Sequence, residues 1–263
     1  MTKLKKDWLQ LTWEGHEIMA FEFKKLPKKI LDITIKDSFE STQSLNNDEV
    51  AKKLTLGVEY VCEGDVEGDI AEFGVGSGRT ALVIASAMRL FDTRNKEKKR
   101  LYLFDSFEGL PEADTSTDAE SPHVKKGIWG KGTCKFNVTV PELTKKLKGI
   151  IQESNFKIFK GWFNETLPLL SPNTKLAMIH VDCDLYKSTI DVLDYCFSHA
   201  MVQEGTAIFF DDYNCNRAAK SFGERKAWSE IIEKYSVDYS DSGDYAWAGK
   251  KFIVHSYKKA PEN

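Results

Sequence analysis

The sequence predicts an α/β fold in which a mainly parallel sheet is covered by helices on both faces. Short apolar runs rich in β-branched and aromatic residues alternate with longer stretches whose apolar residues recur every three or four positions. This alternation is typical of parallel strands joined by right-handed helical crossovers. The last strand, after an irregular stretch at residues 239–244, is the one that could insert antiparallel. The expected strands are residues 70–73, 101–104, 156–159, 176–181, 206–210 and 251–257, and the expected helices are residues 79–91, 141–151, 188–200 and 217–235.

The length of the chain favours one domain over residues 1–263, because a chain of this size can bury a full core. Two segments lie outside the alternating pattern. Residues 1–47 carry aromatic side chains among charges, which predicts a cover segment packed on the core. Residues 111–133 combine acidic residues, prolines and glycines, which predicts a long lid loop over a site, with a disordered surface insertion as the alternative.

The composition excludes several classes of partner. A formal net charge of -3 gives no basic excess of the kind that binds phosphate backbones, so we expect no nucleic-acid partner. The first thirteen residues contain no apolar run long enough for a signal peptide or a membrane span, so we expect no membrane partner. The five cysteines are scattered and lack CxxC spacing, which predicts reduced thiols in a cytoplasmic protein.

A glycine-rich turn connects the first core strand to the helix at residues 79–91, with the sequence EFGVGSGR. Its glycines allow a sharp turn and a close approach of the backbone to a ligand, although glycine also occurs where a helix packs tightly on a strand. Dinucleotide folds use GxGxxG, whereas Arg79 stands here in place of the third glycine. The carboxylate of Glu72 would repel a pyrophosphate and could accept hydrogen bonds from an ammonium group, which favours S-adenosylmethionine over NAD. We therefore assign Glu72, Gly74, Gly76, Ser77 and Gly78 to the cofactor site.

An acidic residue ends the second expected strand, where Asp105 and Ser106 follow residues 101–104. Doubly wound folds bind a ribose diol at this position, because a carboxylate can accept two hydroxyl hydrogen bonds. We therefore predict Asp105 as the ribose ligand and place Ser106 beside it in the cofactor site.

Four aspartates follow two further strands of the expected sheet. Asp182 and Asp184 come after residues 176–181, and Asp211 and Asp212 come after residues 206–210. Like charges gathered at one sheet edge repel one another unless a cation neutralises them, and an oxygen-only set selects Mg²⁺, or else Mn²⁺ or Ca²⁺. Capping of the next helix is the alternative for any one of them. His180, inside the strand, is interpreted as a buried histidine and not as a ligand.

The ordered strings AEFGVGSGRT, LYLFDSFEGLPE, KGWFNETLP, IHVDCDLYKST and FFDDY resemble the macrocin O-methyltransferase family of bacterial enzymes, which methylate sugar hydroxyls on macrolides and aminocoumarins. The resemblance covers residues 69–213 continuously. It implies a seven-stranded class I methyltransferase fold that is Rossmann-like, S-adenosylmethionine as cofactor, a Mg²⁺ ion, and a dimer or larger homo-oligomer.

Residue roles follow from the same resemblance. Asp182, Asp211 and Asp212 look like the metal ligands, and Asp184 looks like the general base, with Lys187 in reserve. If the turn after the strand stays extended, the side chains at positions 182 and 184 point the same way. Gly161 and Trp162 would lie beside the adenine, and Asp182 would also border the cofactor.

The function that we predict is transfer of a methyl group from S-adenosylmethionine to a hydroxyl of a sugar or a sugar-containing small molecule. Chelation of a hydroxyl and a neighbouring oxygen by the metal points to a sugar diol, with a catechol as the alternative acceptor. A glycosyltransferase that uses the Asp182-x-Asp184 pair is the competing enzyme class, and a metal-binding scaffold without catalysis is the third possibility. Binding of S-adenosylhomocysteine as against UDP and GDP separates these hypotheses.

Overall fold

The computed structural model describes residues 11–13, 16–18, 35–91 and 98–258. The chain divides into two compact units, Met1–Asn47 and Asp48–Asn263. In the first unit, β1 (Leu11–Trp13) pairs antiparallel with β2 (His16–Ile18). The expected cover segment at residues 1–47 falls mostly outside the described residues, so its packing on the core stays a prediction.

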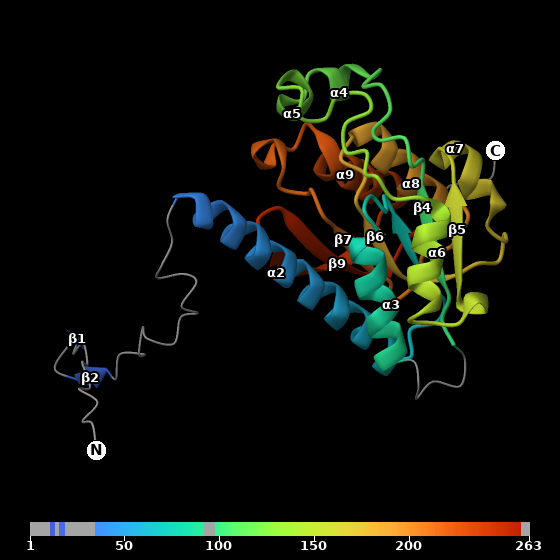
Figure 1. Cartoon of the computed structure of the whole chain (residues 1–263), viewed down its shortest axis with the longest axis horizontal. Coiled ribbons are helices and arrows are strands. Elements are labelled where there is room, and N and C mark those ends of the chain that lie inside the picture. The colour runs from blue at the N-terminus through green and yellow to red at the C-terminus, as the bar shows by residue number, and fades with distance from the viewer. Residues whose placement is uncertain (1–10, 14–15, 19–34, 92–97, 259–263) are drawn as a thin grey trace. The chain divides into compact units, whose positions relative to one another are not determined.

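A seven-stranded sheet forms the centre of the second unit, counted over the described residues (Figure 1). Its strands are β3 (Asp69–Phe73), β4 (Leu101–Asp105), β5 (Phe156–Lys160), β6 (Leu176–Val181), β7 (Ala207–Phe210), β8 (Asp238–Tyr245) and β9 (Gly249–Ser256). Their spatial order is β5-β4-β3-β6-β7-β9-β8, with β3 to β7 parallel. β9 runs antiparallel to β7, as the sequence allowed, and β8 runs antiparallel to β9. The order reverses at β3, and such a switch point is where open α/β sheets bind ligands.

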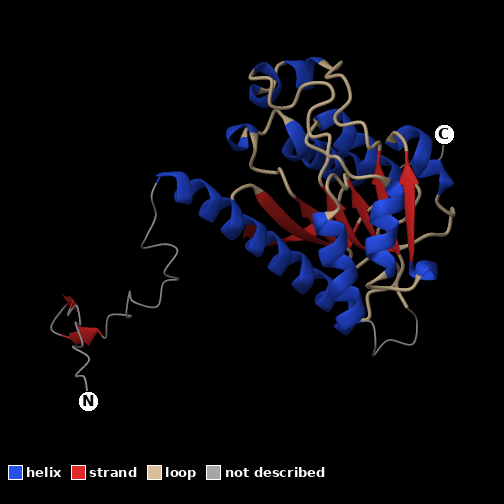
Figure 2. Cartoon of the chain, viewed as in Figure 1, coloured by secondary structure: helices blue, strands red, loops and turns tan. Residues whose placement is uncertain are grey.

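Helices cover both faces of this sheet (Figure 2), which confirms the predicted α/β class. One core contains buried side chains from residues 50–62, from α3 (Arg79–Phe91) and from α6 (Val140–Lys148), packed on the sheet. The other core contains side chains from α8 (Tyr186–Ser198) and α9 (Gly223–Tyr235), with α7 (Phe163–Thr166) at its margin. Residues 50–62 lie in α2 (Ile35–Glu63). Each described helix is too short or too polar to cross a bilayer.

Two expectations about the C-terminal third were wrong. Residues 239–244, expected to be irregular, belong to the edge strand β8, although its register with β9 shifts between Asp241 and Asp244. Its sequence DYSDSGDY lacks an apolar run because half of its residues are exposed. The helix expected over residues 217–235 begins only at Gly223. Before it, Asn216, Arg217 and Ala218 have φ values of 55°, 63° and 53°, a left-handed turn that no α-helix can contain.

The segment 111–133, expected to be a lid loop, contains two short helices, α4 (Ser116–Ala119) and α5 (Pro122–Lys125). It is joined to the rest of the fold by a buried carboxylate. Asp118, 1% exposed, accepts hydrogen bonds from the backbone N–H groups of Tyr186 and Lys187 at 2.8 and 3.0 Å. A residue of this segment therefore caps the first turn of α8, the role that sequence reasoning considered for the strand-end aspartates.

Removal of this cap should destabilise the protein. We expect Asp118→Ala to lower the free energy of unfolding by about 0.5–2 kcal/mol, because two N–H groups of α8 lose their acceptor. Urea denaturation of wild type and variant measures the change. Asp114→Ala, at an exposed aspartate of the same segment, is the control and should change stability by less than about 0.5 kcal/mol. Equal effects of the two substitutions would contradict the capping role.

Candidate active site

The glycine turn after β3 touches the turn after β6. Gly74 has a φ of +90°, and a Cβ built on it would lie 1.8 Å from the carbonyl oxygen of Asp182. The two turns are also joined by a hydrogen bond from Asp182 N–H to the Phe73 carbonyl at 2.8 Å. Only glycine fits at position 74, because any side chain would force the two strand ends apart.

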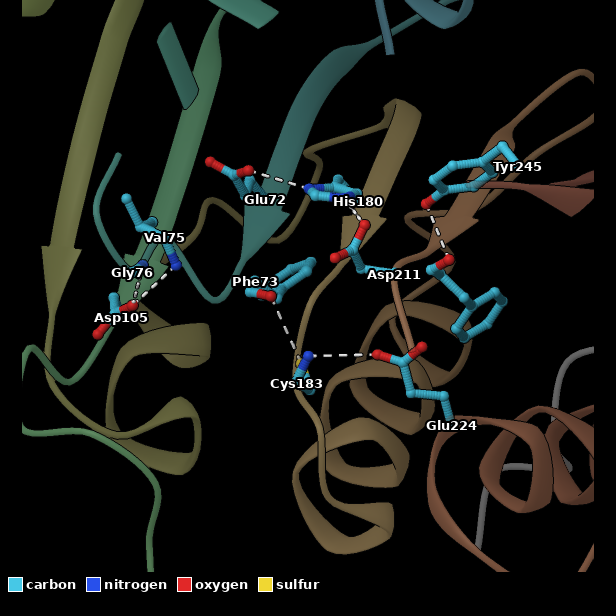
Figure 3. Close-up of polar contacts among 11 residues, drawn as sticks. Glu72, Phe73, Val75, Gly76, Asp105, His180, Cys183, Asp211, Glu224 and Tyr245 are labelled. Carbon is cyan, nitrogen blue, oxygen red and sulfur yellow. Dashed lines mark hydrogen bonds and ion pairs between the residues drawn. The ribbon is translucent and has the colours of Figure 1, made fainter. Parts of the chain in front are cut away.

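Asp105, at the carboxyl end of β4, holds the same glycine turn from the other side (Figure 3). Its Oδ2 accepts the backbone N–H groups of Val75 and Gly76 at 2.7 and 2.9 Å. Its Oδ1 accepts the N–H of Phe107 at 2.5 Å. The carboxylate thus fixes the backbone of the turn, a role that sequence reasoning missed. Of the four lone-pair sites of the carboxylate, these bonds leave one on Oδ1, so a ribose contact there stays a prediction beside this role.

A cavity of about 810 Å³, including its open mouth, lies at this edge of the sheet. Its walls contain most of the residues predicted to bind the cofactor, namely Gly74, Gly76, Asp105, Ser106, Gly161, Trp162 and Asp182. Phe136 and Phe163 add apolar surface, and Trp162 is 36% exposed. Ser77, Gly78 and Glu72 are not among the lining residues. Aromatic surface next to polar turns suits a ligand with a flat base and a polar end.

Three of the four strand-end aspartates come together beside this cavity. One carboxylate oxygen each from Asp182, Asp184 and Asp212 lies within 4.8 Å of the others, a spacing that could hold a metal ion. The turn between the first two is not extended as expected: Asp184 has a φ of +58°, and Leu185 N–H bonds to the Cys183 carbonyl at 2.5 Å. This tight turn still brings the two carboxylates together.

Crowding of these carboxylates changes their acidity. Burial, followed by the charges of Asp211 and Asp212, raises the pKa of Asp182 well above its usual value. Burial and the neighbouring Asp212 and Asp182 do the same to the pKa of Asp184. For Asp212, burial and Asp211 raise the pKa to about 6. The carboxylates therefore resist full ionisation without a counter-charge, which is the electrostatic condition that a cation relieves.

Asp211 faces a buried histidine (Figure 3). One of its carboxylate oxygens lies 4.0 Å from His180 Nε2, while His180 Nδ1 lies 2.9 Å from Glu72 Oε1. Burial lowers the pKa of His180, but the carboxylates of Asp211 and Glu72 outweigh it and raise that pKa to about 10. Glu72 is fully buried and directed to this imidazolium, so its assigned cofactor contact stays a prediction. The interpretation of His180 as a buried histidine agrees with its 0% exposure.

Lys187, the reserve candidate for the general base, forms an ion pair with Asp191. Its ammonium group lies 2.5 and 2.6 Å from the two carboxylate oxygens of Asp191, one turn further along α8. Its side chain is half exposed, and it does not line the cavity, whereas Asp184 does. Of the two candidates for the base, Asp184 is therefore the one that faces the cavity.

A buried glutamate that sequence reasoning missed joins the two aspartate turns. Glu224, in the first turn of α9 and 1% exposed, accepts the N–H of Cys183 at 3.3 Å and the N–H of Asp212 at 2.9 Å. Burial and the charges of Asp212 and Asp182 raise its pKa well above the usual value. In the sequence, Glu224 is one of several acidic residues on an amphipathic helix, and nothing distinguishes it from a surface residue.

The sheet order and the glycine turn at its centre define the class I methyltransferase fold. The O-methyltransferase NovP is similar in structure with a TM-score of 0.62 and 23% identity, over 78% of this chain and 79% of that one. The calicheamicin methyltransferase CalS11 gives a TM-score of 0.61 and 22% identity, over 77% of each chain. These likenesses establish the fold.

The family follows from the sequence comparison. The profile of the Macrocin-O-methyltransferase family matches residues 20–239, and the chain belongs to that family. Demethyldecarbamoylnovobiocin O-methyltransferase of Streptomyces niveus is 29% identical over 67% of this chain and 65% of its own length. Mycinamicin III 3''-O-methyltransferase of Micromonospora griseorubida is 26% identical over 67% of this chain and 68% of its own. The chain thus matches about two thirds of the length of these relatives. The predicted family and fold are confirmed.

The contact between the two turns can be tested with glycine substitutions. We expect Gly127→Ala to cost about 1–2 kcal/mol, because Gly127 has a φ of +72° but no atom within 4 Å of a built Cβ. Gly74→Ala should cost about 1–3 kcal/mol more, since the new methyl group also meets the Asp182 carbonyl. Urea denaturation of both variants separates backbone strain from the close approach. Equal losses of stability would mean that the two turns can move apart freely.

Proposed function

We propose that this protein transfers the methyl group of S-adenosylmethionine to a hydroxyl group of a sugar or a sugar-containing small molecule, aided by a divalent metal ion. The main support for the proposal is that Asp182 belongs both to the contact with the glycine turn and to the aspartate cluster. Its backbone touches the glycine turn, and its carboxylate belongs to the aspartate cluster. A cofactor in the cavity and a hydroxyl at the cluster would therefore be neighbours.

The residues around the cavity fit S-adenosylmethionine, which supplies an electrophilic methyl group on a sulfonium. The turn at Gly74 and Gly76 lines the cavity, and so does Asp105, whose remaining acceptor site could bind a ribose hydroxyl. Gly161 and Trp162 offer a flat apolar surface to the adenine. Positioning of the sulfonium opposite the attacking oxygen is the main contribution of these residues to the rate.

The aspartate cluster fits a hard divalent cation, because its donors are all oxygens and its carboxylates are too crowded to ionise alone. A bound Mg²⁺, or Mn²⁺ or Ca²⁺ in its place, supplies Lewis acidity that lowers the pKa of a coordinated hydroxyl. We propose as the metal-binding residues Asp182 and Asp212, which belong to the cluster, together with Asp211, which follows the same strand as Asp212 and faces His180. Mg²⁺ is the member of this group that we expect in the cell.

Asp184 is the proposed general base. It shares the cluster with Asp182 and Asp212 and lines the cavity in which an acceptor would bind. Burial, Asp212 and Asp182 raise the pKa of Asp184, and a bound cation would lower it again, so that the ionised carboxylate could accept a hydroxyl proton. As the carbon–oxygen bond forms and the carbon–sulfur bond breaks, that proton would pass to Asp184.

The segment expected to be a lid borders the cavity at its two ends. Pro111 lines the cavity at its start, and so do the flanking residues Gly109, Leu110 and Cys134. The relatives named above act, by their names, on demethyldecarbamoylnovobiocin and on the 3'' oxygen of mycinamicin III. We propose that this segment covers a related acceptor, and that a sugar diol is favoured over a catechol.

The cofactor assignment predicts a loss of affinity in Asp105→Ala. We expect its binding of S-adenosylhomocysteine to weaken by about 1.5–3 kcal/mol, since hydrogen bonds to a charged group are lost. Calorimetry measures this, with Glu108→Ala, at an exposed neighbour, as the control that keeps wild-type affinity. Unchanged affinity in Asp105→Ala would remove the ribose assignment. Binding of UDP or GDP in place of S-adenosylhomocysteine would favour a glycosyltransferase.

The metal assignment predicts which aspartate substitutions abolish the response to Mg²⁺ and which lower kcat. Mg²⁺ should raise the melting temperature of wild type, because a ligand that binds only the folded state stabilises it. Asp211→Asn and Asp212→Asn should lose this response. Asp184→Asn should keep it while kcat falls by about 10² to 10⁴. Asp191→Asn, at the exposed partner of Lys187, is the matched control and should behave as wild type. Full activity in EDTA, or near-normal turnover of Asp184→Asn, would refute this scheme.

A further inference from the structure

Glu224 is placed where one side chain can set the spacing of both aspartate turns. Its two carboxylate oxygens diverge to separate partners, with Oε1 on the N–H of Cys183 and Oε2 on the N–H of Asp212 (Figure 3 shows the Cys183 contact). Cys183 lies between the two aspartates of the first turn, and Asp212 belongs to the second. The carboxylate therefore bridges the ends of β6 and β7 outside their last backbone hydrogen bonds.

The bridge is supported from behind by the start of α9. Gly223 has a φ of +55°, and a Cβ built on it would lie 3.5 Å from the carbonyl oxygen of Asp184, so the helix begins directly against the first turn. Phe222, the N-cap residue, has no side-chain capping bond. A negative side chain in the first helical turn is stabilised by the helix dipole, which compensates in part for burial beside other carboxylates.

A carboxylate is an unusual choice for the inside of an acidic cluster. Its charge lies beside those of Asp212 and Asp182 and repels them. A neutral glutamine would avoid that repulsion, but it offers one oxygen acceptor where two N–H donors must be satisfied. The geometry thus requires two acceptors at this position, and the two turns that they hold carry the proposed metal-binding residues.

We infer that Glu224 is a positioning residue that sets the affinity of the aspartate cluster for a divalent cation by holding the turns at residues 182–184 and 211–212 in register. The inference rests on the proposed function. Glu224 itself points its oxygens at backbone N–H groups and so acts through the aspartates. Partners of this kind, which orient metal-binding side chains, typically contribute one to two orders of magnitude to metal affinity.

The test compares Glu224→Gln with wild type in Mn²⁺ binding measured by electron paramagnetic resonance. We expect the Mn²⁺ dissociation constant to rise about 10- to 100-fold, because one turn is released. Affinity for S-adenosylhomocysteine should stay within about twofold of wild type, since Glu224 does not line the cavity. Glu224→Asp keeps the charge but shortens the side chain, and should give the same loss of Mn²⁺ affinity. The protein concentration used to fit the Mn²⁺ dissociation constant is the concentration of molecules that bind S-adenosylhomocysteine. Misfolded molecules therefore do not contribute to the measured Mn²⁺ affinity.

The matched control is Glu230→Gln, on the same helix. Glu230 also accepts a hydrogen bond, from the Tyr186 hydroxyl at 2.7 Å, but contacts neither aspartate turn in the described contacts. It should bind Mn²⁺ as wild type does. Wild-type Mn²⁺ affinity in both Glu224 variants would overturn the inference and leave the proposed function standing. Failure of wild type itself to bind Mn²⁺ would overturn both.

Discussion

The close approach of two backbone turns is the constraint on which this site depends. The turn at Gly74 lies against the carbonyl of Asp182, with no room for a side chain between them. Because β3 and β6 are neighbours at the switch point of the sheet, this contact places the glycine turn and the first aspartate turn at one edge. The cavity, the aromatic wall and the carboxylate cluster are all arranged around that contact.

Carboxylates distant in the sequence keep the surrounding turns in place. Asp105 accepts N–H groups of the glycine turn, Asp118 accepts those that begin α8, and Glu224 accepts one from each aspartate turn. Turns cannot satisfy their backbone donors as strands do, and a carboxylate offers several acceptor sites in a small volume. Of the three, Glu224 is the one whose charge acts on Asp212 and Asp182, so it orders the two turns and adds to the negative charge there.

The features that the sequence predicts are those with a local sequence pattern, and the features that it misses depend on contacts between distant segments. Buried strands and the aspartates after them were predictable, since parallel strands end together at one edge and apolar runs mark their ends. The strand at residues 238–245 was missed because an exposed edge needs no apolar pattern. Asp118 and Glu224 were missed because each is a common helical acid until the fold buries it against a distant turn. The roles of these two carboxylates depend on contacts with segments that are distant in the sequence.

The two aspartates after β7 have different surroundings, although they are adjacent in the sequence. Asp212 joins the cluster with Asp182 and Asp184, while Asp211 lies 4.0 Å from the imidazole of His180. The Glu72 carboxylate lies on its other side, and the two carboxylates outweigh burial and raise the pKa of that imidazole to about 10, which favours its positively charged form. It offsets part of the repulsion at the edge without entering the cavity. The cluster that faces the cavity is thereby left short of positive charge, and a divalent cation bound there would complete the neutralisation that His180 begins.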